Sequence, residues 1–162
     1  MRILFGSTDM LIHLSENQHN FRNLYYSCGI LLSMINKLIY ADITFKIRGI
    51  LYRTHNELGR YCNEKQYADS VENYLIKLGI KYEREKVLSP MFHKEMIGRN
   101  KVDFLILDLI VLEIKTKRVL TREDYYQVKR YLVALNKKLG ILVNFRQAFL
   151  VPKRVLNSAA KE

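Results

Sequence analysis

The stretch KVDFLILDLIVLEIKTK, residues 101–117, constrains the fold of this chain more than any other part of the sequence. Its two apolar runs, 102–107 and 110–114, are rich in Val, Ile and Leu and short enough to be buried strands. Asp108 and Leu109 lie between the runs and suit a tight reversal. We therefore predict a β-hairpin here.

The predicted hairpin brings three charged side chains to one of its ends. Asp103, near the start of the first strand, lies beside Glu113, near the end of the second. Because side chains alternate along a strand, Glu113 and Lys115 share a face. Buried charge is costly unless it is paired or binds a metal, so the cluster indicates a functional site. The alternative is an exposed hairpin that carries an Asp and a Glu–Lys pair.

Two carboxylates on neighbouring strands provide the hard oxygen ligands that Mg²⁺ and Mn²⁺ prefer. Proteins usually hold these ions with few ligands and several waters, so Asp103 and Glu113 are enough for a candidate site. The Lys115 ammonium beside them can orient a water or stabilise charge that builds on a phosphate.

The charge of the chain favours a polyanionic partner. Lys and Arg outnumber Asp and Glu by 27 to 16 in 162 residues, which gives a net charge of +11. Nucleic acid is the first candidate partner and an anionic membrane surface the second. A basic protein without either partner is the alternative that charge alone leaves open. The length fits one domain with a full core.

Cysteine usage and hydropathy bear on the compartment. Cys28 and Cys62 match no metal-ligand or disulfide framework, which is typical of free thiols in a reducing compartment. The chain does not begin with a secretory signal pattern. Its most apolar window, residues 24–40, is interrupted by polar residues and too short to span a bilayer. We therefore expect a cytoplasmic protein without a membrane partner, and a homodimer is left open.

Residues 1–33 lack a sustained period and are predicted to be a poorly ordered or accessory N-terminal extension. Residues 34–157 are predicted to form the domain, and 158–162 a loose tail. Hydrophobic periodicity and capping residues place the elements in order. We predict helices over 40–58 and 63–78, a strand over 80–92, the hairpin, a helix from Thr121 to about Lys138 that stops at Gly140, and strands over 141–145 and 149–156. This order predicts an α/β fold with helices flanking a mixed central sheet.

One acid of the second helix stands out. Glu64 falls on the apolar stripe of that helix, three residues before Tyr67. One explanation is a first-turn acid that interacts favourably with the helix dipole. The other is that Glu64 points at the acids of the hairpin.

With these elements placed, the chain resembles the GxxExxY proteins, a branch of the PD-(D/E)XK nuclease superfamily, from about residue 52 to residue 156. Two positions depart from the pattern: Tyr61 stands where the family has the glycine that names it, and Val102 stands in place of the superfamily's nominal proline. The resemblance is carried by Tyr52, the run 55–59, Glu64, Tyr67, Asp103, Glu113, Ile114, Lys115, Gln127, Tyr131 and the run 140–145.

The resemblance implies a restriction-endonuclease-like core and Mg²⁺-dependent, or Mn²⁺-dependent, hydrolysis of phosphodiester bonds in nucleic acid, with DNA favoured. It implies that Asp103 and Glu113 ligate the metal and that the backbone carbonyl of Ile114 completes the protein ligands. Glu64 would bind the metal directly or through water.

The same resemblance implies roles for the neighbouring polar groups. Lys115 would orient the nucleophile, and Gln127 and Tyr131, one helical turn apart, would position substrate or Lys115. His55 could approach the metal or simply pack. The candidate nucleic-acid contacts are the basic residues Lys117, Arg118, Lys129 and Arg130.

Two other functions remain open. A Holliday-junction-type resolvase shares the early acid, the Asp and the E-x-K pattern, but it would have to act as a dimer on branched DNA. A catalytically silent nucleic-acid-binding module of the same fold is the alternative that is not an enzyme. The intact set of acids and lysine argues against that module, because a pure binder has no need of carboxylates that face phosphate.

Overall fold

The computed structural model describes residues 39–90, 96 and 98–161, so the predicted extension 1–33 lies outside the described residues. Contacts group Asp42–Glu162 into one compact unit. The described elements follow in the order α2 (Ala41–Leu58), α3 (Glu64–Lys77), β1 (Tyr82–Val87), β2 (Lys101–Ile106), β3 (Ile110–Lys115), α4 (Arg122–Ala134), β4 (Leu139–Asn144) and β5 (Lys153–Leu156).

The five strands form one mixed sheet in the order β1-β2-β3-β4-β5. Strand β2 is antiparallel to both of its neighbours, β3 and β4 are parallel, and β5 returns antiparallel to β4. The parallel pair needs a crossover connection, which α4 provides. The predicted fold class, a mixed sheet flanked by helices, is therefore confirmed.

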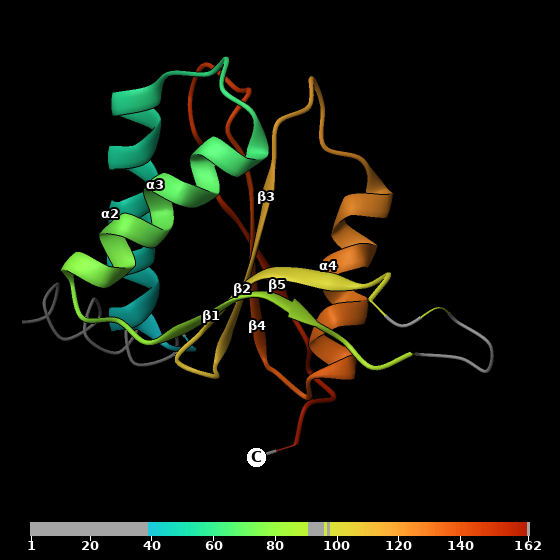
Figure 1. Ribbon diagram of the computed structural model, residues 1–162. Coiled ribbons are helices and arrows are strands. Elements are labelled where there is room, and N and C mark those ends of the chain that lie inside the picture. The colour runs from blue at the N-terminus through green and yellow to red at the C-terminus, as the bar shows by residue number, and fades with distance from the viewer. Residues whose placement is uncertain (1–38, 91–95, 97, 162) are drawn as a thin grey trace, which may run out of the picture. The chain divides into compact units, whose positions relative to one another are not determined.

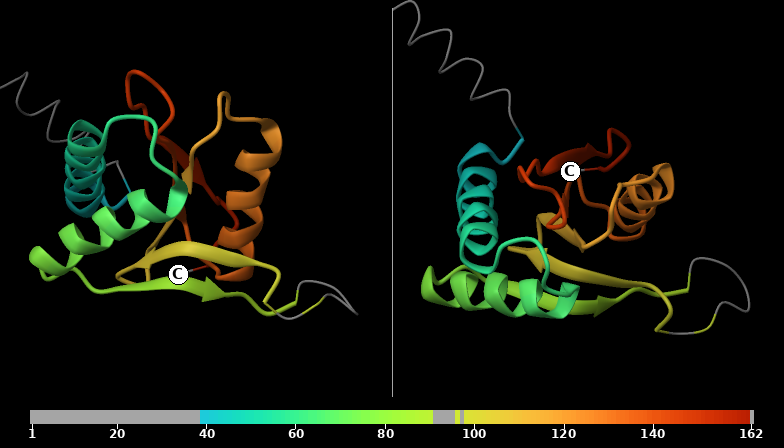
Figure 2. Two further views of the ribbon diagram at one scale, coloured as in Figure 1. Left: turned by 45° about the horizontal axis from the view of Figure 1, so that its top comes forward. Right: turned by 90° about the horizontal axis from the view of Figure 1, so that it is seen from above.

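Helices cover both faces of this sheet, α2 and α3 on one side and α4 on the other (Figures 1 and 2). On the α3 side, Tyr67 stacks on Phe145 with 4.2 Å between the ring centroids and 8° between the planes. On the α4 side, Val128 packs directly over Gly140 of β4. Strand β3 lies between the two helical layers, and every residue from Ile110 to Ile114 is buried.

Helix boundaries on the α2–α3 side follow from capping. Gly59 takes a φ of +66° after α2, as a left-handed terminator should. Asn63 and Gln66 form a reciprocal capping box at the start of α3, each side chain accepting the other's backbone N–H at 3.0 Å. The two predicted helices therefore begin and end within one or two residues of the observed α2 and α3.

The prediction that the third helix extends to about Lys138 and stops at Gly140 is wrong. Helix α4 ends at Ala134, and Asn136 takes the left-handed conformation at φ 50°. Asparagine tolerates this conformation, so it ends the helix without a glycine. Gly140 lies inside β4, which begins at Leu139. Leu139, which falls inside the predicted helix, therefore belongs to β4.

Two predicted strands are shorter in the structure. Strand β1 covers Tyr82–Val87, and residues 91 and 92 of the predicted strand 80–92 lie outside the described residues. Strand β5 covers Lys153–Leu156 and begins directly after Pro152, which cannot donate a backbone hydrogen bond to the ladder. No helix among the described residues is long and apolar enough to cross a membrane.

Two glycine substitutions test this packing in opposite directions. A Cβ at Gly140 would lie 2.5 Å from Val128 Cγ1, so Gly140→Ala should destabilise the fold by about 1–3 kcal/mol. A Cβ at Gly49, in α2, would have no neighbour within 4 Å, so Gly49→Ala should stabilise the fold by about 0.5–1 kcal/mol. Urea unfolding measures both, and equal effects of the two changes would contradict the packing described for Gly140.

Candidate active site

The backbone ladder between β2 and β3 runs from Ile106↔Ile110 to Phe104↔Leu112. At the next position a side chain replaces the backbone acceptor. Asp103 Oδ2 accepts the Ile114 backbone N–H at 2.6 Å. This bond fixes the Asp103 carboxylate against the end of β3, at the residue that directly follows Glu113.

Glu113 is the buried acid of β3, with only 2% of its surface exposed. Lys115, two residues on, shares its face and donates from Nζ to Glu113 Oε1 at 2.8 Å. The other oxygen, Glu113 Oε2, is buried and has no hydrogen-bond partner. A buried acceptor without a partner costs free energy, so this oxygen is suited to a further ligand.

Glu64 reaches the same end of β3 from the first turn of α3. Its Oε1 accepts the Thr116 backbone N–H at 3.0 Å, which ties the start of α3 to the residue after Lys115. Glu64, Asp103 and Ile114 line one hollow of about 210 Å³. The remaining residues that line it are Lys65, Ala68, Arg84 and Glu85.

Gln127 and Tyr131 lie on α4, on the opposite side of the sheet from α3. Gln127 Nε2 donates to the Tyr131 hydroxyl at 2.6 Å, and Tyr131 is buried. Burial raises the pKa of Tyr131, and the charge of Glu113 raises this pKa further. The two residues therefore bond to each other near the acids, while Lys115 pairs with Glu113.

Burial dominates the electrostatics of the acids. It raises the pKa of Glu113 from 4.5 to about 7, and the Asp103 charge adds to this rise, while Lys115 opposes it. Burial also raises the pKa of Asp103, against the opposing effects of the Ile114 N–H and of Lys115. Burial alone would lower the pKa of Lys115, but Glu113 outweighs it, so that pKa is raised and the ammonium keeps its charge.

The ligand atoms at this end of β3 meet the needs of a small divalent ion. No group of three or more His, Cys, Asp or Glu side chains among the described residues is arranged to hold a metal ion. A metal here would depend on the Asp103 and Glu113 carboxylates, a backbone oxygen and waters. Mg²⁺ is commonly bound through one or two carboxylates and several waters, and the free Glu113 Oε2 offers a ligand atom, so the residues fit this ion.

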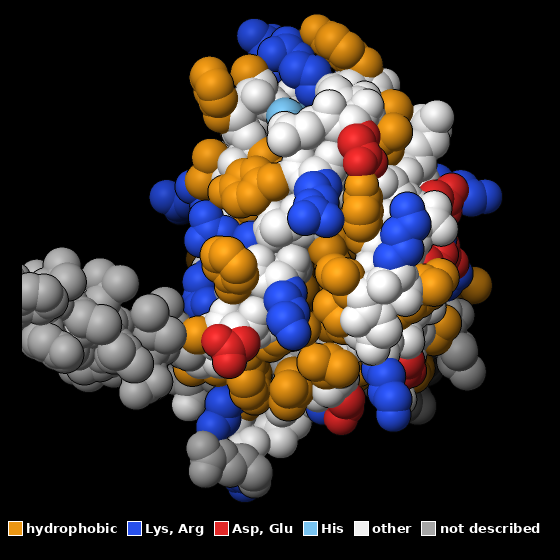
Figure 3. Space-filling view, turned by 90° about the vertical axis from the view of Figure 1, so that its left-hand side faces the viewer, with side chains coloured by type: hydrophobic (Ala, Val, Ile, Leu, Met, Phe, Trp, Pro, Cys, Tyr) orange, Lys and Arg blue, Asp and Glu red, His pale blue; other side chains and the backbone are white. Residues whose placement is uncertain are grey.

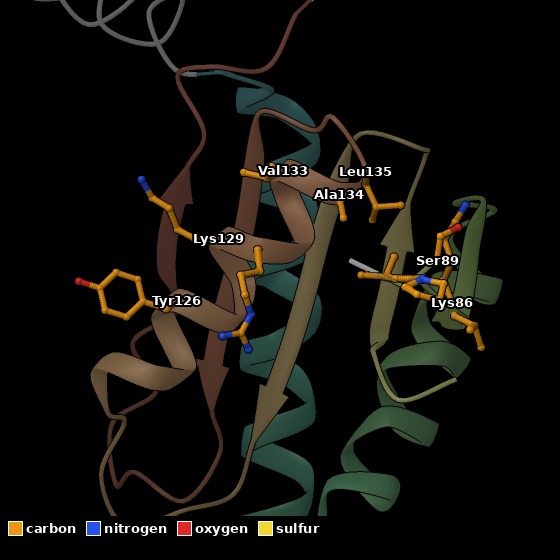
Figure 4. Close-up of a pocket in the computed structure, with 11 residues that line it drawn as sticks. Lys86, Ser89, Tyr126, Lys129, Val133, Ala134 and Leu135 are labelled. Carbon is orange, nitrogen blue, oxygen red and sulfur yellow. The ribbon is translucent and has the colours of Figure 1, made fainter. Parts of the chain in front are cut away.

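The four basic candidates have different surroundings. Lys117 Nζ is paired with the buried carboxylate of Asp124 at 2.7 Å, whereas Arg118 is exposed. Lys129 and Arg130 line a separate hollow of about 650 Å³ between α4 and the end of β1 (Figure 4). That hollow shares no lining residue with the one at Glu64 and Asp103.

The sequence did not predict the contacts of Asn144 and Glu85, whereas packing was one of the two roles predicted for His55. His55 Nε2 lies 2.9 Å from the Gln147 carbonyl, which makes it a packing residue of the β4–β5 connection. Buried Asn144 bonds both the backbone N–H and the carbonyl of Lys117, at 3.2 and 2.7 Å. Glu85, at φ 49°, interrupts the β1–β2 register opposite Asp103. A polar Asn at the end of an apolar strand was the only signal of these contacts in the sequence.

A family model described as the PD-(D/E)XK nuclease superfamily matches residues 41–155, which cover α2 through β5 up to Val155. The match concerns the superfamily, so the narrower resemblance to GxxExxY proteins stays a prediction. Neither the curated proteins nor the solved structures contain a significant match.

The raised pKa of Glu113 predicts how stability depends on pH when no metal is bound. The folded protein holds this proton up to about pH 7 and the unfolded chain releases it near 4.5, so stability falls as pH rises through that window. At about 1.4 kcal/mol per pKa unit, ionisation costs the fold about 3 kcal/mol. Glu113→Gln should show a smaller decline between pH 5 and pH 8 in EDTA, measured by urea unfolding, because only the raised pKa of Asp103 remains.

The control for this experiment is Glu83→Gln, which changes an exposed side chain of β1 and should keep the wild-type pH dependence. Parallel pH profiles for wild type and Glu113→Gln would contradict the burial of an ionisable Glu113. Comparing slopes rather than absolute stabilities removes the constant effect of leaving Lys115 without its partner.

Proposed function

This chain belongs to the PD-(D/E)XK nuclease superfamily, and from that premise we propose that it is a Mg²⁺-dependent nuclease that hydrolyses phosphodiester bonds, with DNA as its substrate. The observation that carries the proposal is the set formed by Asp103, Glu113 and Lys115. The buried acid Glu113, the half-buried acid Asp103 and a paired lysine converge at one end of β3, and one buried carboxylate oxygen is left without a partner.

In the proposed mechanism, Asp103 and Glu113 hold the divalent ion, with the Ile114 carbonyl and Glu64, directly or through water, as the remaining ligands. When bound, the ion lowers the pKa of a coordinated water and neutralises charge on the scissile phosphate. Lys115 remains protonated beside Glu113, so its ammonium can orient the attacking water and stabilise the charge that develops on the phosphate.

Gln127 and Tyr131 are proposed to position the substrate or Lys115. Their mutual bond fixes the Gln127 amide and the Tyr131 hydroxyl on the face of α4 that turns toward the acids. Tyr131 is buried and Gln127 partly exposed, so Gln127 is the member of the pair that a phosphate can reach. Tyr131 then acts mainly by holding Gln127 in place.

Nucleic acid is proposed as the partner because of the charge balance. A net charge of +11 attracts phosphate, and neutralised phosphates release counterions on binding. Arg118, Lys129 and Arg130 are the stronger candidate contacts. Lys117 is the weaker one, since Asp124 already neutralises it. A cytoplasmic site of action and a homodimer remain proposals that these features leave open.

Cleavage and binding should separate by mutation. Asp103→Asn removes a metal ligand and a negative charge that repels phosphate, so cleavage should fall by at least about 100-fold while DNA binding persists or tightens. Lys115→Ala should also abolish cleavage, but it should weaken binding because a cation that faces phosphate is lost. The assay follows linear, single-stranded and branched DNA in Mg²⁺ or EDTA, with binding measured in Ca²⁺.

Glu83→Gln again serves as the control, because it changes an acid of β1 that does not line the hollow. Cleavage by Asp103→Asn at the wild-type rate would rule out the metal mechanism. Cleavage confined to branched DNA would instead favour the resolvase, and metal-independent binding without any cleavage would favour the silent binding module.

Metal binding should also be visible without substrate. A divalent ion requires ionised carboxylates, and Glu113 holds its proton up to about pH 7. Mg²⁺ should therefore raise the melting temperature more at pH 8 than at pH 5.5, and Asp103→Asn should remove this gain. A thermal shift that is equal at both pH values, or equal in wild type and variant, would contradict the assigned ligands.

A further inference from the structure

The turn between α2 and α3 presents an aromatic ring to solvent. Tyr61 is 75% exposed. Two guanidinium groups lie near its ring, that of Arg60 at 5.2 Å and that of Arg146 at 5.7 Å from the centroid. Arg60 is a neighbour in sequence, whereas Arg146 comes from the connection between β4 and β5.

This turn is held at both ends by one side chain. The Tyr67 hydroxyl donates to the Gly59 carbonyl at 2.7 Å and accepts the Cys62 backbone N–H at 3.3 Å. Tyr67 itself is fully buried and stacked on Phe145, so its hydroxyl is a fixed anchor. The exposed ring of Tyr61 therefore extends from a constrained turn and not from a loose loop.

Contacts link Tyr61 to the candidate active site. Arg146 Nε donates to the Thr116 carbonyl at 3.4 Å, and the Thr116 N–H donates to Glu64. Tyr61 precedes Glu64 by three residues, so their Cα atoms are at most about 11 Å apart. Figure 1 places the α2–α3 turn, the β3–α4 connection and the β4–β5 connection at the same edge of the molecule.

The surface at this edge combines basic and apolar side chains. Viewed from the α2 side, Lys and Arg side chains and hydrophobic side chains lie next to each other at the top of the molecule (Figure 3). An exposed aromatic ring beside guanidinium groups is the arrangement that binds single-stranded nucleic acid: the ring stacks on a base and the cations attract the adjacent phosphates. A base inside a duplex has both faces covered and cannot stack on such a ring.

We propose that Tyr61, flanked by Arg60 and Arg146, is a stacking site for an unpaired nucleobase at the edge of the candidate active site. Because a stacked strand rises about 3.4 Å per nucleotide and the Cα atoms of Tyr61 and Glu64 are at most about 11 Å apart, the base lies within about three nucleotides of the bond that is cut. The substrate class is therefore nucleic acid with single-stranded nucleotides next to the scissile bond. This inference rests on the proposed nuclease function and adds its substrate class.

The chain contains no tryptophan, so Tyr61→Trp introduces a single fluorescent reporter that keeps the ability to stack. Its emission should be quenched on titration with a single-stranded oligothymidine in EDTA, where no cleavage occurs. A blunt duplex should cause little quenching. The control is Phe45→Trp, which places the reporter at an 80% exposed position about 20 Å away along α2.

Affinity provides the second readout. Tyr61→Ala should weaken binding of the single strand about 5- to 100-fold and leave blunt-duplex binding within about twofold. Tyr61→Phe keeps the ring and should bind within about threefold of wild type. Tyr61→Ala should leave the salt dependence unchanged, whereas Arg146→Ala should lower the slope of log affinity against log salt by about one.

Three results would overturn the inference. They are an unquenched Tyr61→Trp, a Tyr61→Ala variant with wild-type affinity for single strands, and an equal loss of affinity for single strands and duplexes. All of these are binding results without metal, so they are independent of the cleavage assay. Cleavage that depends on Asp103 together with an unaffected Tyr61→Ala would remove this inference alone, and quenching without any cleavage would remove only the nuclease function.

Discussion

The burial of the Glu113 carboxylate is the constraint on which the rest of this structure depends. The acid lies in the middle strand of a five-stranded sheet with apolar neighbours on both sides in sequence, where an isolated charge would cost several kcal/mol. Lys115 satisfies one oxygen, and the raised pKa shows that the remaining cost is not removed by that pair. Burial of this carboxylate lowers the stability of the fold, and a cation bound to it would offset that loss.

Several contacts around Glu113 serve to hold the end of β3 in one place. The Asp103 carboxylate accepts the backbone N–H of Ile114. The Asn144 side chain holds the segment after β3 by accepting the backbone N–H of Lys117 and donating to its carbonyl. Glu64 adds a bond to Thr116 from the other helical layer. Together with Glu113 these side chains come from β2, β4, α3 and β3, so the position of each acid depends on the sheet being assembled.

Much of this arrangement was predictable from local sequence. Strand and helix order follow from periodicity and caps, and the ten-residue gap from Asp103 to Glu113 suffices to predict a hairpin with acids at one end. Gly140 was misjudged because a glycine in sequence signals either a helix end or a close approach, and only the contact with Val128 distinguishes them. The partners of Glu64 and Asn144 lie 52 and 27 residues away in sequence, and no local pattern specifies them.

For the proposed nuclease function, the same electrostatics means that substrate affinity has to come from outside the cluster of Asp103, Glu113 and Glu64. Asp103, Glu113 and Glu64 repel phosphate until a cation is bound, and Lys115, which is paired with Glu113, offsets only part of that repulsion. An excess of eleven positive charges over the whole chain compensates for this repulsion at long range, but it does not select one form of nucleic acid over another. Selection requires contacts with bases, and those are short-ranged. A rigid aromatic ring at the edge, tied through Arg146 and Thr116 to Glu64, meets that requirement without adding another charge to the cluster.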